Sequence, residues 1–160
     1  LQLAQVEAGS PKARFETVDL TKLCQTIVEV FEPAAVEDGH ILHCETPNAE
    51  IIVQGERALL GQMLSNLIEN AIRHTPPKTV ITVTLGSFQG HPQITVADTG
   101  HGIPADERDK VIRRLYRLDR SRTTPGNGLG LSLVEAVAKL HGAEMQLEDN
   151  APGLRIILRF

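Results

Sequence analysis

The sequence contains little cysteine, few aromatic residues and no long hydrophobic run. Of its 160 residues two are Cys, one is Tyr and none is Trp, and aromatic residues make up 3%. Cys24 and Cys44 lack CxxC spacing, which argues against a disulfide scaffold or a cysteine zinc site and predicts two buried, reduced thiols. So few aromatic rings also argue against a surface that stacks nucleic-acid bases.

An excess of basic charge is also missing. Lys and Arg number 16 against 20 Asp and Glu, a formal net charge of -4, whereas nucleic-acid-binding domains are more often basic as a whole. No apolar run approaches the roughly 20 residues that span a membrane, and the N-terminus has no signal-peptide pattern. We therefore expect no nucleic-acid partner and no membrane contact by this domain.

The remaining composition fits one globular domain. Hydrophobic residues make up 41% and charged residues 22%, and domains typically contain roughly 100–200 residues. The sequence starts at Leu1 without an initiator Met, so we expect a fragment of a longer protein.

Hydrophobic periodicity and turn residues predict an alternation of helices and strands. Residues 1–8 are predicted to be the end of a helix, and 86–92 a turn-rich loop within a hairpin. Further helices are predicted at 19–38, 56–75, 105–115 and 128–141, and strands at 14–18, 40–45, 51–54, 80–85, 93–97, 144–148 and 154–160. This order predicts an α+β sandwich with a mixed, largely antiparallel sheet covered by helices on one face.

The predicted helix 56–75 carries the first functional motif. At about 100° per residue, Asn66, Asn70 and Arg73 lie on one edge, beside an apolar stripe. Amide oxygens suit Mg²⁺, and guanidinium groups suit phosphate oxygens. Taken alone, the pattern is better explained as a solvated helix surface, because two Asn at this spacing occur easily by chance.

The second motif, Asp98-Thr99-Gly100-His101-Gly102-Ile103-Pro104, directly follows a predicted strand. A carboxylate there can accept a hydrogen bond from an exocyclic amine, and the glycines let the backbone approach a flat ligand. The simpler interpretation is a turn that ends the strand.

The third motif, Gly126-Asn127-Gly128-Leu129-Gly130-Leu131, opens the last predicted helix. Backbone N–H groups at a helix N-terminus favour an anion, although a glycine cap would look alike. A Rossmann fingerprint fails because the third glycine comes one residue early, and a P-loop fails because the chain has no Gly-Lys pair.

Together, in this order, the motifs make the chain resemble the catalytic ATP-binding domain of bacterial sensor histidine kinases, in the GHKL superfamily. NLIENAIRHTP resembles the N box, DTGHGIP and GNGLGLSLV the two glycine boxes, and RRLYRLDRSR the lid-leading F box. The resemblance implies a Bergerat-type fold with five strands and three helices. It also implies that residues 1–14 end a dimerisation helix and its linker, and that 15–160 form the ATP-binding domain.

The resemblance implies ATP and Mg²⁺ as ligands. Asn70 would coordinate Mg²⁺ with Asn66 beside it, Arg73 would contact phosphate, and Asp98 would accept from the adenine amino group. The remaining implied contacts are His74, Gly100, Gly102 and Ile103 around the base, Gly126, Gly128, Leu129 and Gly130 over the phosphates, and Arg114, Tyr116 and Arg117 in a lid.

Asn66 separates two reaction classes. In relatives that hydrolyse ATP, the corresponding helix segment resembles E-x-x-x-N. In this chain the residue four before Asn70 is Asn66 instead of Glu, and an Asn side chain cannot act as a general base. Glu69 is the nearest carboxylate. It either has a secondary role in the reaction or is only a solvated charge on the helix surface. The motif thus favours phosphoryl transfer to a protein histidine, catalysed with Asn66, Glu69 and Asn70, over ATP hydrolysis.

Other features leave alternatives open. The F box of the family usually has two Phe, and this chain has Ile112 and Leu115 at those positions. This difference leaves open the alternative of a pseudokinase that binds nucleotide without transferring phosphate. None of the six His lies in an H-[DE]-x-[RK]-x-P context, so the acceptor histidine is expected on a dimerisation helix absent from this chain. His40, His43 and His91 are expected at the surface or in strands. The implied partners are that helical domain and a response regulator, in a homodimeric parent protein, with this domain in the cytoplasm.

Overall fold

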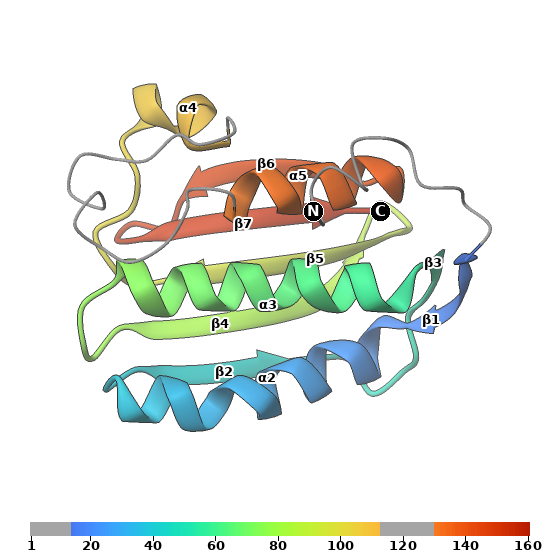
Figure 1. Ribbon diagram of the computed structural model, residues 1–160, viewed down its shortest axis with the longest axis horizontal. Coiled ribbons are helices and arrows are strands. Elements are labelled where there is room, and N and C mark those ends of the chain that lie inside the picture. The colour runs from blue at the N-terminus through green and yellow to red at the C-terminus, as the bar shows by residue number, and fades with distance from the viewer. Residues whose placement is uncertain (1–13, 113–129) are drawn as a thin grey trace.

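The computed structural model describes residues 14–112 and 130–160, which form two sheets and a layer of helices (Figure 1). The larger sheet has the strand order β2-β4-β5-β7-β6. Its strands are β2 (Ile41–Glu45), β4 (Val80–Phe88), β5 (His91–Asp98), β6 (Glu144–Asp149) and β7 (Leu154–Arg159). Within it, β2 and β4 run parallel, and the other neighbouring pairs are antiparallel. A separate antiparallel ribbon joins β1 (Glu16–Asp19) to β3 (Ile52–Gly55).

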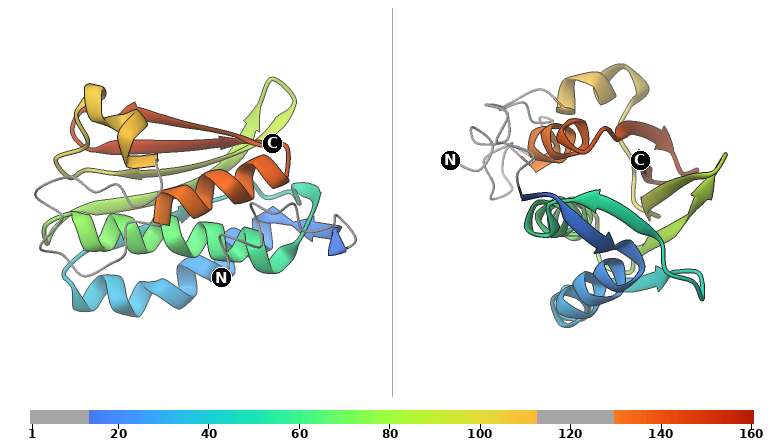
Figure 2. Two further views of the ribbon diagram at one scale, coloured as in Figure 1. Left: turned by 45° about the horizontal axis from the view of Figure 1, so that its top comes forward. Right: turned by 90° about the vertical axis from the view of Figure 1, so that its right-hand side faces the viewer.

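Helices cover one face of the five-stranded sheet (Figure 2). They are α2 (Leu20–Glu37), α3 (Arg57–His74) and α5 (Gly130–Leu140), and a 3₁₀ turn (Ala105–Glu107) leads into the short α4 (Arg108–Ile112). The predicted α+β sandwich, with a mostly antiparallel five-stranded sheet and three helices on one face, is confirmed. In the described part of the chain, no helix is both long and apolar enough to cross a membrane.

Helix boundaries follow the predicted start and stop signals. The Asp19 side chain caps α2 by accepting hydrogen bonds from the backbone N–H groups of Thr21 and Lys22, at 2.9 and 3.3 Å. Gly39 follows this helix with a φ of 79°, a left-handed conformation that costs glycine little. Helix α3 lies between Glu56 and Thr75, as predicted.

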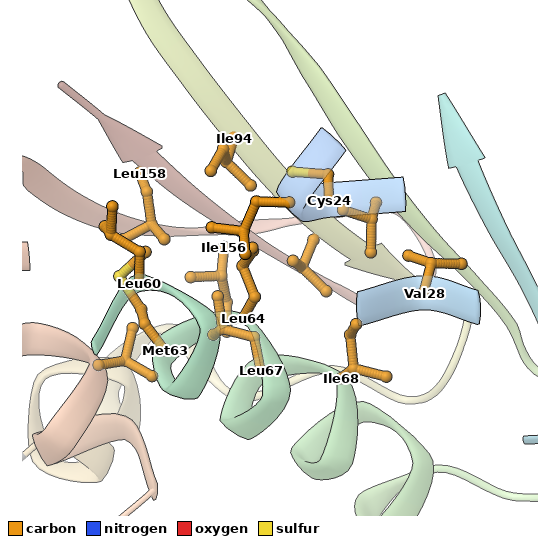
Figure 3. Packing of buried hydrophobic residues seen from close by; sticks show 14 of the residues in the cluster. Cys24, Val28, Leu60, Met63, Leu64, Leu67, Ile68, Ile94, Ile156 and Leu158 are labelled. Carbon is orange, nitrogen blue, oxygen red and sulfur yellow. The ribbon is translucent and has the colours of Figure 1, made fainter. Parts of the chain in front are cut away.

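The core lies between the helix layer and the sheet (Figure 3). Helix α3 contributes an apolar face at i, i+3, i+4 and i+7 spacing, which is the pattern of a helix packed on one side. Its buried residues are Leu60, Met63, Leu64, Leu67, Ile68, Ala71 and Ile72. Because this face is fixed against the sheet, the polar edge of α3 is held in one orientation. Cys24 is buried in the same core and Cys44 is partly buried, both as free thiols.

The β4–β5 hairpin is longer than predicted. Strand pairing extends to Phe88 and His91, so the expected loop at 86–92 shrinks to the two residues Gln89 and Gly90, with φ of 51° and 82°. Two positive φ values suit the tight turn that matches strand twist. Pro92 has no N–H to donate, but the strand tolerates it. Its carbonyl accepts the Phe160 N–H, so the hydrogen-bonding side of Pro92 faces β7 and the missing donor removes no bond to β4.

The expectation for His40 was wrong, whereas His43 and His91 lie exposed in strands. His40 is only 4% exposed, and its Nε2 lies 2.9 Å from the Thr75 hydroxyl oxygen. A histidine can be buried when a ring nitrogen finds such a partner, and the local sequence gives no sign of one 35 residues away.

A half-buried junction at the other end of the helix layer depends on neutral His141. Its Nδ1 lies 2.7 Å from the Val137 carbonyl, and its Nε2 accepts the Glu56 N–H at 3.0 Å. The Phe15 ring stacks on the imidazole, with centroids 4.9 Å apart. Burial lowers the pKa of His141 below its ordinary value of 6.5, against weaker raising effects of the Val137 carbonyl and Glu56.

We expect this junction to make folding stability sensitive to mild acid. A folded-state pKa below the unfolded one means that the unfolded chain binds the proton more tightly, so stability is full above pH 6.5 and declines below it. Urea unfolding at about pH 7.5 and 5.5 should show a larger loss for the wild type than for His141→Gln, which does not titrate. Equal losses would contradict the described role of His141.

Candidate functional site

Asp98 is a buried carboxylate at the end of β5. The residue is 7% exposed. Its Oδ1 accepts the backbone N–H of Gly100 at 2.9 Å and that of Leu154 at 3.3 Å. Within the described residues no donor is bonded to Oδ2, so that oxygen is the one available to a ligand. A carboxylate fixed in this way offers one oriented acceptor.

The environment of Asp98 changes its protonation equilibrium. Burial raises the pKa of its carboxyl above the ordinary value of 3.8, because the charged form loses water. Hydrogen bonds from Gly100 and Leu154 and the nearby His101 act in the opposite direction and are weaker. Perturbed pKa values of buried carboxyl groups cluster at functional sites, which makes Asp98 a candidate site residue.

The C-terminal end of α3 packs against the first glycine segment. A Cβ on Gly100 would lie 2.7 Å from Thr75 Cγ2 and 3.1 Å from Asp98 Oδ1. Thr75 is itself held, because its hydroxyl donates to the Ala71 carbonyl and contacts His40 Nε2. Gly100 is thus required for close contact between the two predicted motifs.

The start of α5 packs against Asn70. A Cβ on Gly130 would lie 2.8 Å from Asn70 Nδ2 and 3.1 Å from its Oδ1. Asn70 is half-buried, and its carboxamide therefore lies directly beside the first turn of α5. The third motif, as far as it is described, thus reaches the first. In Figure 1 these contacts lie at the left-hand end, where α3 ends and α5 begins.

The other predicted residues of α3 lie along its polar edge. Asn66 is half-buried, and its Oδ1 accepts a hydrogen bond from Gln62 Nε2 at 2.9 Å. This bond leaves the Asn66 Nδ2 hydrogens to donate elsewhere. Glu69, Arg73 and His74 are exposed, and the last two lie in the final turn of the helix.

The turn between β6 and β7 is a part of the site that the motifs did not indicate. Gly153 has a φ of 109°, and a Cβ there would overlap the Asp98 carbonyl oxygen and lie 2.9 Å from Asp98 Oδ1. Its own carbonyl oxygen lies 2.7 Å from where a Gly102 Cβ would be. Asn150 Nδ2 donates to the Asp98 carbonyl at 2.7 Å, across 52 residues of sequence. No local pattern connects segments so far apart.

Some predicted residues lie outside the described part of the chain. They are residues 1–13 and the predicted contacts Arg114, Tyr116, Arg117, Gly126, Gly128 and Leu129. Ile103 is described and half-buried, and its carbonyl accepts a hydrogen bond from Arg108 Nε at 3.2 Å.

Comparisons of the sequence with known proteins give one family and several relatives. Residues 55–160 match the family described as "Histidine kinase-, DNA gyrase B-, and HSP90-like ATPase". The chain is 34% identical over 155 residues to "Probable sensor histidine kinase TcrY" of Mycobacterium tuberculosis, covering 96% of this chain and 32% of that protein. It is 39% identical over 102 residues to "Signal transduction histidine-protein kinase/phosphatase MprB" of Mycolicibacterium vanbaalenii, covering 63% and 21%. The chain thus spans about a third or less of these relatives.

Solved structures show the same fold. "Mycobacterial sensor histidine kinase MprB" superposes with a TM-score of 0.79 at 28% identity, covering 91% of this chain and 96% of that one. The catalytic domain of histidine kinase ThkA superposes with a TM-score of 0.81 at 24% identity, covering 91% and 96%, which shows the fold alone. The chain therefore belongs to the family of histidine kinase-, DNA gyrase B- and HSP90-like ATPases, as a catalytic ATP-binding domain of the sensor histidine kinase type.

Proposed function

We propose that this domain binds Mg²⁺-ATP and presents the γ-phosphate to a histidine on a separate dimerisation helix. The observation that carries the proposal is the pairing of a buried, oriented Asp98 with the amide-lined edge of α3. The acceptor nitrogen would form a bond to the γ-phosphorus, the bond from that phosphorus to the β–γ bridging oxygen would break, and ADP would leave.

Asp98 is the proposed recognition residue for adenine. Its Oδ1 is occupied by two backbone N–H groups, so Oδ2 would accept the hydrogen bond from the exocyclic amine. Gly100, Gly102 and Ile103 follow directly. A Cβ on Gly100 would meet Thr75 and one on Gly102 would meet the Gly153 carbonyl, so both positions require glycine. His74, at the end of α3, would lie at the rim of this pocket.

Phosphate and Mg²⁺ would lie along the α3–α5 contact. Among the described residues no group of three or more His, Cys, Asp and Glu could hold a metal alone. An amide oxygen with phosphates and waters fits Mg²⁺, which usually keeps several waters and takes substrate phosphates as ligands. Asn70 would supply that oxygen. When bound, the ion would neutralise charge on the phosphates, and Arg73 and the Gly130 end of α5 would add positive potential.

Asn66 favours transfer over hydrolysis. Its Oδ1 accepts from Gln62, so the Nδ2 donor is the group that would bind a ligand. A donor can bind phosphate oxygen but cannot take a proton from water. Glu69 is exposed beside Asn70 and is proposed only to assist the incoming imidazole.

Labelled ATP tests the reaction class. The chain is mixed with a dimerisation-helix fragment that carries an acceptor histidine, Mg²⁺ and γ-³²P-labelled ATP. Acid-labile, alkali-stable label on the fragment supports the proposal. ATP binding without label would instead indicate a pseudokinase, and steady phosphate release without label would indicate a hydrolase. The expected partners beyond the helix are a response regulator and a second copy of the parent protein.

Replacing Gly130 with alanine tests the contact between α5 and Asn70. The new Cβ would lie 2.8 Å from Asn70 Nδ2, and a flexible carboxamide yields more readily than a backbone. We expect Mg²⁺-ATP affinity to fall by about tenfold, as for one lost hydrogen bond to a charged ligand. Stability should stay within about 0.5 kcal/mol of the wild type, because alanine favours helix. Calorimetric titration and urea unfolding measure the two quantities.

Gly61→Ala is the matched control. Gly61 lies inside α3, where a new Cβ would make ordinary contacts of 3.8 Å with Ile27 and Leu23. It should stabilise the chain by up to about 1 kcal/mol and leave ATP affinity unchanged. If both variants bind ATP as tightly as the wild type, Asn70 does not contact the bound nucleotide.

A further inference from the structure

Asp98 lies at the point where β5 leaves its β7 partner. On one side it pairs with Ile81 of β4. On the other side, the pairing of β5 with β7 ends at Ala97 and Arg155, one residue before Asp98. The main chain of Asp98 therefore lies beyond the ladder that holds the rest of β5 against β7.

Asn150 holds Asp98 at this point. Its Nδ2 donates to the Asp98 carbonyl at 2.7 Å, a short bond for a neutral donor and acceptor. Leu154, four residues later, donates its N–H to Asp98 Oδ1 at 3.3 Å. The β6–β7 turn thus holds both the backbone and the carboxylate of the same residue.

The Asn150 side chain is itself fixed in one orientation. Its Oδ1 accepts a hydrogen bond from Arg155 Nη2 at 3.0 Å, and its backbone N–H donates to the Gly153 carbonyl at 3.0 Å. A guanidinium only donates and a carbonyl only accepts, so the amide must direct Oδ1 to Arg155 and Nδ2 to Asp98. Reversing the amide would break both bonds.

We propose that Asn150 is a positioning residue that sets the selectivity of this domain for a purine with a 6-amino group. The inference rests on the proposed role of Asp98 in recognising the adenine amine. A hydrogen bond to that amine depends on the direction of Asp98 Oδ2, because hydrogen bonds weaken steeply with angle. Asn150 does not touch the base, and it fixes the main-chain position from which the carboxylate extends.

The proposal predicts a change in base discrimination rather than in overall binding. The measured quantity is a selectivity ratio: the Kd of purine riboside triphosphate divided by the Kd of ATP. Purine riboside triphosphate lacks the 6-amino group. We expect a ratio of about ten or more in the wild type, the worth of one hydrogen bond to a carboxylate. Asn150→Ala and Asn150→Asp should lower it at least about threefold, mainly by weakening ATP, with the Kd of purine riboside triphosphate changing less than about twofold.

Asn150→Asp is the sharper of the two variants. It keeps the size of the side chain and the acceptor for Arg155, replaces the donor that faces the Asp98 carbonyl with an oxygen, and adds one negative charge. Gln146→Ala is the matched control, since Gln146 is an exposed amide on β6 that bonds Glu148 at 3.0 Å and not Asp98. Thermal unfolding of each variant verifies that it is folded at the titration temperature.

Calorimetric titration of the chain with both nucleotides and Mg²⁺ separates the outcomes. A reduced ratio in both Asn150 variants but not in Gln146→Ala supports the proposal. An unchanged ratio, or an equal loss of affinity for both nucleotides, overturns it and gives Asn150 a purely structural role. Asp98→Asn tests the underlying function, because it should bring the ratio to about one whatever Asn150 does. If Asp98→Asn leaves the ratio unchanged, the proposed function of Asp98 itself fails.

Discussion

Asp98→Asn is expected to weaken ATP binding by about a hundredfold, a loss of roughly 2–3 kcal/mol from a hydrogen bond to a charged group. Asparagine can keep its Oδ1 in place to accept from Gly100 and Leu154. Its Nδ2 would then replace Oδ2 and would face the adenine amine as a second donor. Calorimetric titration with Mg²⁺-ATP measures the loss.

The same variant should not lose stability. Asparagine removes a buried charge whose desolvation is the main cause of the raised pKa of Asp98. Because the folded chain holds this proton more tightly than the unfolded chain, the Asp98 carboxyl should contribute stability as pH falls from neutral toward 3.8, opposite in sign to the contribution of His141. Asp98→Asn should lack that contribution, which urea unfolding across this range measures.

Asp149→Asn provides the control for Asp98→Asn. Asp149 is an exposed carboxylate at the end of β6, and its Oδ1 accepts the Ala151 N–H at 3.2 Å. Asparagine can accept the same bond, so neither ATP affinity nor stability should change. If Asp149→Asn weakened ATP binding as much as Asp98→Asn, the loss would not be specific to adenine recognition by Asp98.

The sequence predicted the parts of the site that depend on local pattern. Helix α3 has an apolar face and clear end signals, so the shared polar edge of Asn66, Asn70 and Arg73 followed from helical geometry alone. Asp98 was predicted at a strand end because β-branched residues precede it and glycines follow. Both predictions needed only residues that are neighbours along the chain.

The contacts that complete the site depend on tertiary structure. Asn150 and Gly153 reach Asp98 because β7 pairs with β5, and nothing near residue 150 indicates which strand will be its neighbour. His40 was misjudged for the same reason, since its partner Thr75 approaches only when β2 packs beside β4. The hairpin loop was overestimated because Gly86 and Pro92 were interpreted as strand breakers, and their positions in the sheet tolerate both.

Gly153→Ala is expected to have the largest effect on stability of the substitutions considered. The φ of 109° disfavours any side chain, at a cost of about 1–3 kcal/mol. The new Cβ would also overlap the carbonyl oxygen of Asp98 and lie 2.6 Å from its carbonyl carbon. These are backbone atoms at the end of a sheet strand, so they cannot rotate away, and the turn or the strand must move.

Movement of either element costs further energy and changes the site. Forced repacking of this kind typically costs about 1–3 kcal/mol, so a total loss of about 2–6 kcal/mol is expected. Displacing Asp98 or the turn would also break the bond from Asn150 to the Asp98 carbonyl. ATP affinity should therefore fall by about tenfold or more even in the fraction that stays folded. Urea unfolding and titration at low temperature measure the two effects separately.

Gly90→Ala separates backbone strain from overlap with Asp98. Gly90 has a φ of 82° and nothing within 4 Å of the position that a Cβ would take. It should therefore cost only the backbone term of about 1–3 kcal/mol and leave ATP affinity unchanged. If Gly153→Ala destabilised the chain no more than Gly90→Ala and bound ATP as tightly, the β6–β7 turn would not hold Asp98. A larger loss of stability together with weaker ATP binding would show that the turn is part of the nucleotide site, because backbone strain alone, as in Gly90→Ala, should leave ATP affinity unchanged.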